Sequence, residues 1–119
     1  MKIFEALRKD HDKQRALLKI LLETQGESPT RQEYFQQLKD ALATHAIAEE
    51  RHFYAPLMQA DETIALSRHG VAEHHQIDKL IAKLDDTEMS SPAWLATFKQ
   101  LTEKVEHHLA EEEREFFQM

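Results

Sequence analysis

Residues 45–54 read HAIAEERHFY, and a related pattern, HLAEEEREFF, returns at residues 108–117. Each copy begins with a histidine and carries a glutamate four residues later, at Glu49 and Glu112. In an α-helix, side chains four residues apart lie on the same face. Each copy therefore predicts a helix that presents one imidazole and one carboxylate together.

The composition of the whole chain favours long helices. Its 119 residues include only 2 glycines and 3 prolines, and 41% of them are hydrophobic. Few helix breakers and a large supply of Leu, Ala, Glu, Lys and Gln indicate an all-α protein, because a β fold needs many more turn residues.

The composition also excludes several classes of function. There is no cysteine, which rules out disulfides, thiolate metal sites and cysteine nucleophiles. The chain has a net charge of −7, so it lacks the excess of basic residues that is typical of a nucleic-acid-binding protein. No apolar run reaches membrane-spanning length, and the charged residues at 1–5 leave no signal-peptide core, so we expect a cytoplasmic protein that does not contact membranes.

Three breaks divide the chain into four predicted helices, at roughly residues 2–25, 30–57, 62–86 and 92–117. Thr30 and Glu33 have the spacing of a capping box at the start of the second helix. Pro56 is expected to end or kink this helix. Ser91 is a predicted N-cap with Pro92 at the first helical position. Short connections make neighbouring helices antiparallel, which predicts an up-down-up-down four-helix bundle.

Each predicted helix carries an apolar stripe with the spacing of a buried helix face. The stripes consist of Phe4, Leu7, Leu18, Leu21 and Leu22; of Phe35, Leu38, Leu42 and Phe53; of Val71, Ile77, Ile81 and Leu84; and of Phe98, Leu101, Val105 and Phe116. A histidine fills a gap in each stripe: His11, His45, His74 and His108. One imidazole from each helix is therefore expected to face the core.

Sequence distances predict that these four histidines lie at one level of the bundle. In an antiparallel hairpin, residues equally far from the turn are level with each other. The midpoint of the first two histidines is residue 28, that of the middle two lies between residues 59 and 60, and that of the last two is residue 91. All three midpoints fall on the predicted breaks, so we expect one layer of imidazoles with Glu49 and Glu112 one turn away.

Four imidazoles and two carboxylates in a helical core predict a metal centre. A buried charge needs a partner, and four histidines joined by two carboxylates are hard to explain without a cation. The sequence repeat predicts two ions side by side, each with one histidine pair, and glutamates that bridge them through their two oxygens. These ligands suit iron, manganese, zinc or copper; two bridging carboxylates favour iron, and zinc is the main competitor.

Four motifs occur in a fixed order along the chain. They are Asp10-His11; His45-x-x-x-Glu49-Glu50 with Tyr54-x-Pro56; Glu73-His74 followed by Ile77; and His108-x-x-x-Glu112 followed by Phe116-Phe117. As an ordered set they resemble the hemerythrin-like, or HHE cation-binding, domains. The resemblance implies one domain over residues 1–119 with a non-haem di-iron centre and an oxo or hydroxo bridge. It also implies dioxygen binding, sensing of dioxygen, nitric oxide or iron, or repair of iron centres.

The chain departs from the oxygen-carrying hemerythrins near its third histidine. Those proteins carry two histidines four residues apart on this helix, whereas Gly70 and Asp78 flank His74 at that spacing here. One ion therefore has one histidine fewer, which water, His69 or an extra carboxylate can replace. The carriers also have an aspartate where this chain has Glu112. Both differences point away from oxygen carriage and toward the four-histidine, two-glutamate sites of bacterial relatives.

Other polar residues near the six ligands have simpler interpretations. Three carboxylates either hold imidazole N–H groups or face solvent, the latter being the simpler case: Asp10, Glu50 and Glu73. His52 is expected in the core or at its rim, and His69 at the surface, although both are candidate extra ligands, as are Asp78, Glu50 and Glu73. His75 and His107 lie off the stripes, in solvent or behind the ligands. Glu113 is expected on a solvated charged face.

Three functions stay open at this point. The first is binding or sensing of O2 or NO, or sensing of iron, at an open coordination position. The second is an iron-handling or redox enzyme that reduces peroxide or O2, repairs iron centres or delivers iron. The third is a metal-free helical interaction module with incidental histidines. No motif identifies a substrate, a redox partner or a protein partner.

Overall fold

The computed structural model describes residues 2–26, 28–59 and 61–115. Most of them are helical: α1 (Lys2–Leu22), α2 (Pro29–Glu49), the π-helical turn η1 (Glu50–Tyr54), α3 (Ala55–Leu57), α4 (Ile64–Asp85) and α5 (Pro92–Glu115). No strand occurs among the described residues, and the expected all-α fold is confirmed. Of the expected apolar stripes, Leu22 is partly exposed at the end of α1, and three side chains lie outside the described part: Phe4, Phe53 and Phe116.

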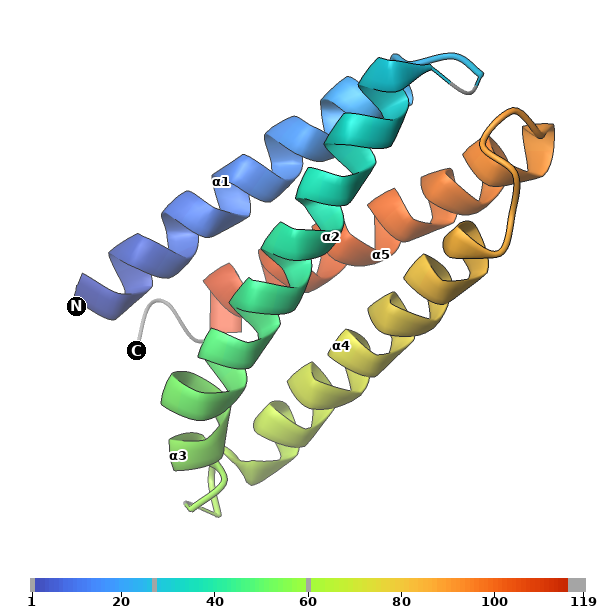
Figure 1. The fold of residues 1–119 in the computed structure, drawn as a ribbon. Coiled ribbons are helices and arrows are strands. Elements are labelled where there is room, and N and C mark those ends of the chain that lie inside the picture. Colours follow the sequence, from blue (N-terminus) through green and yellow to red (C-terminus); the bar gives the residue numbers. More distant parts are fainter. Residues whose placement is uncertain (1, 27, 60, 116–119) are drawn as a thin grey trace.

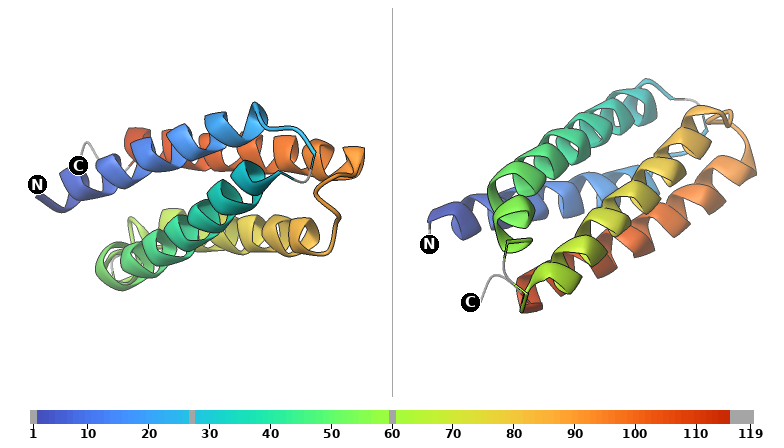
Figure 2. Two further views of the ribbon diagram at one scale, coloured as in Figure 1. Left: turned by 45° about the horizontal axis from the view of Figure 1, so that its top comes forward. Right: turned by 90° about the horizontal axis from the view of Figure 1, so that it is seen from below.

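The long helices form the expected up-down-up-down bundle (Figure 1), in which α2, η1 and α3 run on as one segment. α1 packs on α2, α4 packs on α5, and α1 also contacts α5. Figure 2 shows α1 and α5 in one layer and α2 with α4 in the other. The bundle measures 46 × 24 × 20 Å. In the described part of the chain, none of the helices combines the length and apolar character that a bilayer crossing requires.

A serine followed by a proline begins both α2 and α5. Ser28 caps α2 by accepting a hydrogen bond from the backbone N–H three residues later at 3.1 Å, and Pro29 occupies the first helical turn. The capping box expected at Thr30 is therefore wrong by two residues, because proline suits the first helical position, where no N–H partner is needed. At α5, Ser91 accepts a backbone N–H at 3.1 Å and Pro92 follows, as predicted.

The end of the bundle that contains the α1–α2 and α4–α5 connections is apolar. Trp94 is fully buried and stacks on Phe98 with ring centroids 5.2 Å apart. The guanidinium of Arg31 lies over the Trp94 ring at 4.6 Å and donates to the carbonyls of Thr24 and Met89. This arginine therefore links the two connections. Buried aliphatic side chains extend the core toward the middle of the bundle: Leu18, Leu21, Leu38, Leu84, Leu101 and Val105.

The π-helical turn η1 changes which side chains face the core. The Ala55 N–H bonds to the Glu50 carbonyl, five residues back instead of four. One extra residue in a turn rotates the following side chains by about 100°, and Tyr54 is fully buried. The helix continues through Pro56 and ends at Leu57. The helix end predicted at Pro56 is thus confirmed within one residue. The irregular hydrogen bonding lies in η1, before the proline.

Candidate metal centre

The six expected ligands lie together, on the side of the apolar core away from Trp94. α1 and α4 each supply one histidine, while α2 and α5 each supply a histidine and a glutamate. All six side chains are buried: His11, His45, Glu49, His74, His108 and Glu112. The structure thus brings together the residues that sequence distances predicted at one level, whereas metal ligation by them stays a prediction.

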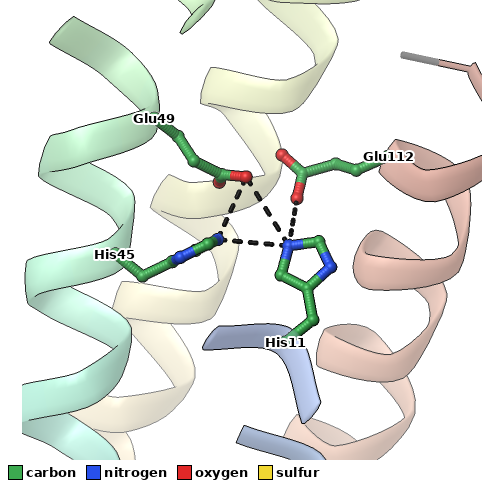
Figure 3. A group of neighbouring side chains, drawn as sticks. All are labelled: His11, His45, Glu49 and Glu112. Atoms are coloured by element: carbon green, nitrogen blue, oxygen red, sulfur yellow. Dashed lines mark hydrogen bonds and ion pairs between the residues drawn. The ribbon is translucent and has the colours of Figure 1, made fainter. Parts of the chain in front are cut away.

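His11 and His45, the first pair, direct their Nε2 atoms toward each other (Figure 3). These nitrogens are 3.1 Å apart. Glu49 Oε2 lies 3.0 Å from the Nε2 atom of His45 and 3.7 Å from that of His11. Glu112 Oε1 lies 3.1 Å from His11 Nε2. Two imidazole nitrogens and two carboxylate oxygens therefore converge, all within 4.8 Å of one another.

His74 and His108, the second pair, meet the same two glutamates. His74 Nε2 lies 3.0 Å from Glu49 Oε1, and His108 Nε2 lies 3.4 Å from Glu112 Oε2. One ligand atom from each of these four residues again falls within 4.8 Å of the others. Each glutamate therefore turns one oxygen to the first pair and the other oxygen to the second pair, which is the arrangement of a carboxylate that bridges two ions.

The Nδ1 atoms of the histidines point toward an outer set of carboxylates. Three of them lie within hydrogen-bond distance: His11 from Glu113 at 2.8 Å, His45 from Asp10 at 3.1 Å, and His108 from Glu73 at 2.9 Å. His74 differs, because its Nδ1 atom lies 3.6 Å from Glu50. A carboxylate on Nδ1 fixes the N–H there and directs the Nε2 lone pair toward the centre.

Cationic side chains hold two of the outer carboxylates. Arg15 of α1 donates two hydrogen bonds to Glu113 at 2.9 and 3.0 Å, and Lys104 Nζ lies 3.4 Å from Glu73. The expectation that Glu113 is solvated is therefore wrong: its side chain is 23% exposed and connects α5 to α1. The charges of Arg15 and Glu113 were visible in the sequence, but only helix packing brings them together.

The protonation of the buried groups follows from these contacts. Burial disfavours a charged His11 imidazole, but the carboxylates of Glu112 and Glu49 outweigh burial and raise the pKa to about 9. Burial likewise opposes charge on His108, yet Glu112 helps to raise its pKa to about 10. Burial alone would raise the pKa of Glu49, but the surrounding imidazoles hold it well below its usual range. Without metal, the ionised Glu49 carboxylate helps to keep protons on His11 and His108, and cations would replace those protons.

Tyr54 lies beside the second pair and was not among the expected site residues. Its hydroxyl donates a hydrogen bond to Glu112 Oε2, and its ring meets the His74 ring edge-on at 5.6 Å. Burial and the charges of Glu112 and Glu49 raise the pKa of the phenol, which therefore keeps its proton. A Cβ atom at Gly70 would overlap the Tyr54 ring and hydroxyl, so a histidine at position 70 does not fit.

The remaining candidate ligands lie outside the six-residue cluster. The side chain of His69 is 52% exposed and lies 3.0 Å from Glu111. Asp78 and His52 are exposed, so the core or rim placement expected for His52 is wrong. Neither residue belongs to a histidine–carboxylate cluster in the described part of the chain. The other two candidates, Glu50 and Glu73, lie on the Nδ1 side of His74 and His108, away from the centre of the cluster.

The buried polar atoms of this cluster fit a pair of cations. Glu49 Oε2, Glu112 Oε1 and His108 Nε2 are buried, and no hydrogen bond within the described structure satisfies them. The imidazoles next to these two carboxylate oxygens are close enough to form ion pairs with them, but they are poorly aligned to donate hydrogen bonds to them. Unsatisfied buried carboxylates are costly, and imidazole nitrogens with carboxylate oxygens suit first-row transition metal ions. The cluster thus has the donor atoms for two such ions.

A small cavity adjoins the histidines on the side of the apolar core. Its volume is about 20 Å³, and it is lined mainly by histidines and apolar side chains: His45, His74, His108, Leu42, Ile77, Val105 and Leu109. Gln14 and Asp78 also line it, and the Gln14 amide nitrogen is buried without a hydrogen-bond partner among the described residues. A surface groove of about 460 Å³ between α1 and α2 also reaches Gln14 and His45. The cavity has room for about one water-sized molecule.

Comparisons with known proteins agree with this geometry. Residues 2–119 match the family model described as the hemerythrin HHE cation binding domain. The crystal structure of an HHE cation binding domain-containing protein from Mycobacterium kansasii is similar, with a TM-score of 0.83 and 27% sequence identity over 95% of this chain and 68% of that chain. No curated protein matches the sequence. The chain belongs to the hemerythrin HHE cation-binding domain family.

Proposed function

We propose that residues 1–119 form one metal-binding domain that holds two non-haem iron ions and binds O2 or NO beside them. The first pair binds one ion, the second pair binds the other, and Glu49 and Glu112 bridge the two. The division of each glutamate between the pairs supports this assignment: the Glu49 oxygens lie 3.0 Å from His45 and 3.0 Å from His74. The outer carboxylates support it further, since ligating histidines usually donate their second N–H to such a partner.

Iron fits this set of ligands better than manganese, because imidazole ligands suit iron while manganese prefers oxygen ligands. It also fits better than zinc. Each ion is offered two imidazoles and two carboxylate oxygens. Four such ligands would complete the usual coordination of a structural zinc ion, whereas iron retains open positions beyond four ligands. Reduced iron supplies electrons and an open coordination position for a small ligand.

The cavity of about 20 Å³ beside three of the four histidines carries the proposal of a small ligand. Sites for organic substrates are usually about 300–1,000 Å³, so this space suits a diatomic molecule instead. The apolar part of its wall, which includes Leu42, Ile77, Val105 and Leu109, offers no hydrogen bonds to water and so favours a weakly hydrated molecule such as O2 or NO. We expect such a ligand to enter from the surface groove, since Gln14 and His45 line both the groove and the cavity.

The first experiment measures metal content and ligand response. Protein from iron-supplemented cells is expected to contain about two irons per chain, and exposure of the reduced, anaerobic protein to O2 or NO should change its visible spectrum. Glu49→Gln removes a charge shared by both pairs and should lose most of the iron while the helices remain. Zinc in place of iron, metal-free wild-type protein, or a spectrum unchanged by both gases would contradict the proposal.

The second experiment tests Gln14 as the hydrogen-bond donor in the cavity. Gln14→Leu keeps a similar volume, so iron content should be unchanged while NO or O2 dissociates faster. Loss of one hydrogen bond of about 1 kcal/mol corresponds to roughly a fivefold change. Gln37→Leu is the matched control, because Gln37 is exposed and lines the surface groove but not the cavity. Equal dissociation rates in wild type and Gln14→Leu would exclude this role.

A further inference from the structure

We propose a third cation site, on the surface where α4 meets α5. Two histidine–glutamate pairs with i, i+4 spacing face each other there: His69 with Glu73 on α4, and His107 with Glu111 on α5. Glu111 joins the two pairs, because one of its oxygens lies 3.0 Å from His69 Nε2 and the other lies 3.1 Å from His107 Nε2. The site would take a divalent first-row ion such as Zn²⁺, for which two imidazoles and a carboxylate are common ligands.

The distances in this surface site suit one ion. His69 Nε2 lies 3.0 Å from Glu111 Oε1 and 3.5 Å from Glu73 Oε1, and one ligand atom from each of these three residues falls within 4.8 Å of the others. A tetrahedral zinc ion about 2.1 Å from each ligand holds its ligand atoms about 3.3 Å apart. The existing side-chain positions therefore need little movement to bind an ion.

Ordinary surface ion pairs do not account for this arrangement as well. An exposed histidine–glutamate pair contributes about 0–1 kcal/mol and costs side-chain entropy. Here the two carboxylates are mostly covered, with Glu73 3% and Glu111 18% exposed, while the imidazoles of His69 and His107 are 52% and 64% exposed. The two carboxylates are thus mostly covered while the imidazoles beside them are open to solvent, so an ion can reach the cluster from water.

Glu73 connects the surface site with the second pair. Its Oε1 atom lies 2.9 Å from His108 Nδ1 as well as 3.5 Å from His69. Lys104 approaches the other oxygen of Glu73 at 3.4 Å and competes with an ion for its charge. We therefore assign His69 and Glu111 as the main ligands and Glu73 as a weaker one. His107, at the other oxygen of Glu111, lies outside this group of mutually close ligand atoms and would join it by moving toward His69. The surface site requires no particular metal in the buried centre.

Equilibrium dialysis of the metal-loaded protein against Zn²⁺ tests the site, with iron and zinc counted together. Wild type should bind one additional zinc per chain while its iron content is unchanged. The variant His69→Ala/His107→Ala should bind this zinc at least about tenfold more weakly, since loss of an outer partner alone costs 10–100-fold. His75→Ala is the matched control, because His75 is exposed on α4 and no contact joins it to the site among the described residues.

Three outcomes would overturn the surface site: no additional zinc in wild type, additional zinc that the double variant retains, or an equal loss in His75→Ala. Circular dichroism of the double variant checks that the bundle is intact, and both substituted side chains are exposed, so folding should be unaffected. If the buried centre takes up zinc instead of iron, wild type and the double variant still differ by one zinc. Failure of the iron proposal is therefore distinguishable from failure of the surface site.

Discussion

The first and second histidine pairs share two glutamates, but their surroundings differ. In the first pair, both Nδ1 atoms lie within hydrogen-bond distance of a carboxylate. In the second pair only His108 does so, and the Nδ1 atom of His74 lies 3.6 Å from Glu50. The second pair has Tyr54 instead, which donates to the shared Glu112. The repeated sequence motif thus gives the two pairs matching ligand positions, but the side chains that contact the ligands from outside differ between the pairs.

The local helix geometry explains much of this difference. After Glu49, the first copy of the repeated motif continues into the π turn η1, which brings Tyr54 into the core. After Glu112, the second copy continues as regular α-helix up to Glu115, where the described residues end. A single extra residue in one helical turn therefore gives the second pair a buried phenol, and it makes glycine necessary at position 70.

The largest effect is expected at Gly70, where the Tyr54 side chain meets α4. Gly70→Ala should destabilise the metal-free protein by about 1–3 kcal/mol, because the new methyl group overlaps the Tyr54 ring and overpacks the core. In a Tyr54→Ala background the same substitution should be neutral or stabilising by up to about 1 kcal/mol, as alanine is the better helix former. Urea denaturation of the four proteins in this double-mutant cycle measures the coupling. Additive effects of the two substitutions would show that the tyrosine does not restrict position 70.

The sequence was sufficient for the histidine layer but not for its surroundings. The midpoints of His11, His45, His74 and His108 fall on the breaks of the chain, and both helical spacing and hairpin symmetry are properties of the chain itself. By contrast, the burial of Tyr54 depends on the π turn η1, which no residue pattern in the sequence predicts. The Arg15–Glu113 contact is equally hidden, because it depends on how α1 rotates against α5. Contacts between helices that are far apart in sequence require the packed structure.

An intermediate effect is expected from the outer carboxylates. Glu113→Gln should weaken binding of the first ion, and Glu73→Gln that of the second ion, each by about 10–100-fold, because the imidazole loses its charged partner. Glu50→Gln should have a smaller effect, since Glu50 lies 3.6 Å from His74. Competition with a chelator, followed through the iron content, measures these affinities.

Glu115→Gln is the matched control for the outer carboxylates, since Glu115 is exposed at the end of α5. If Glu50→Gln weakens iron binding as much as Glu73→Gln does, the second pair is supported like the first, and the proposed difference between the pairs is wrong. If Glu113→Gln releases both ions together, the two pairs act as one unit through the bridging glutamates.

A final effect concerns pH and should arise in both pairs, because each contains at least one histidine with a raised pKa. The pKa is raised from 6.5 to about 9 for His11 and to about 10 for His108. A raised pKa contributes stability that is complete below the unfolded value and is lost as pH rises through the folded value. The metal-free protein should therefore become steadily less stable between pH 6.5 and 9. Its stability should also fall in acid, where Glu49, with its lowered pKa, becomes protonated.

The metal-loaded protein should respond to pH in the opposite direction over the same window. Ions and protons compete for the imidazole nitrogens, so metal affinity, and with it the stability of the loaded protein, rises as pH increases from 6.5 to 9. Thermal unfolding of both forms across this range measures the two slopes, and His11→Asn and His108→Asn in the metal-free protein should each flatten its slope by a comparable amount. Parallel slopes in the two forms would mean that protons and metal do not share these nitrogens. A flattening confined to one variant would mean that the difference between the pairs extends from their outer contacts to the ligands themselves.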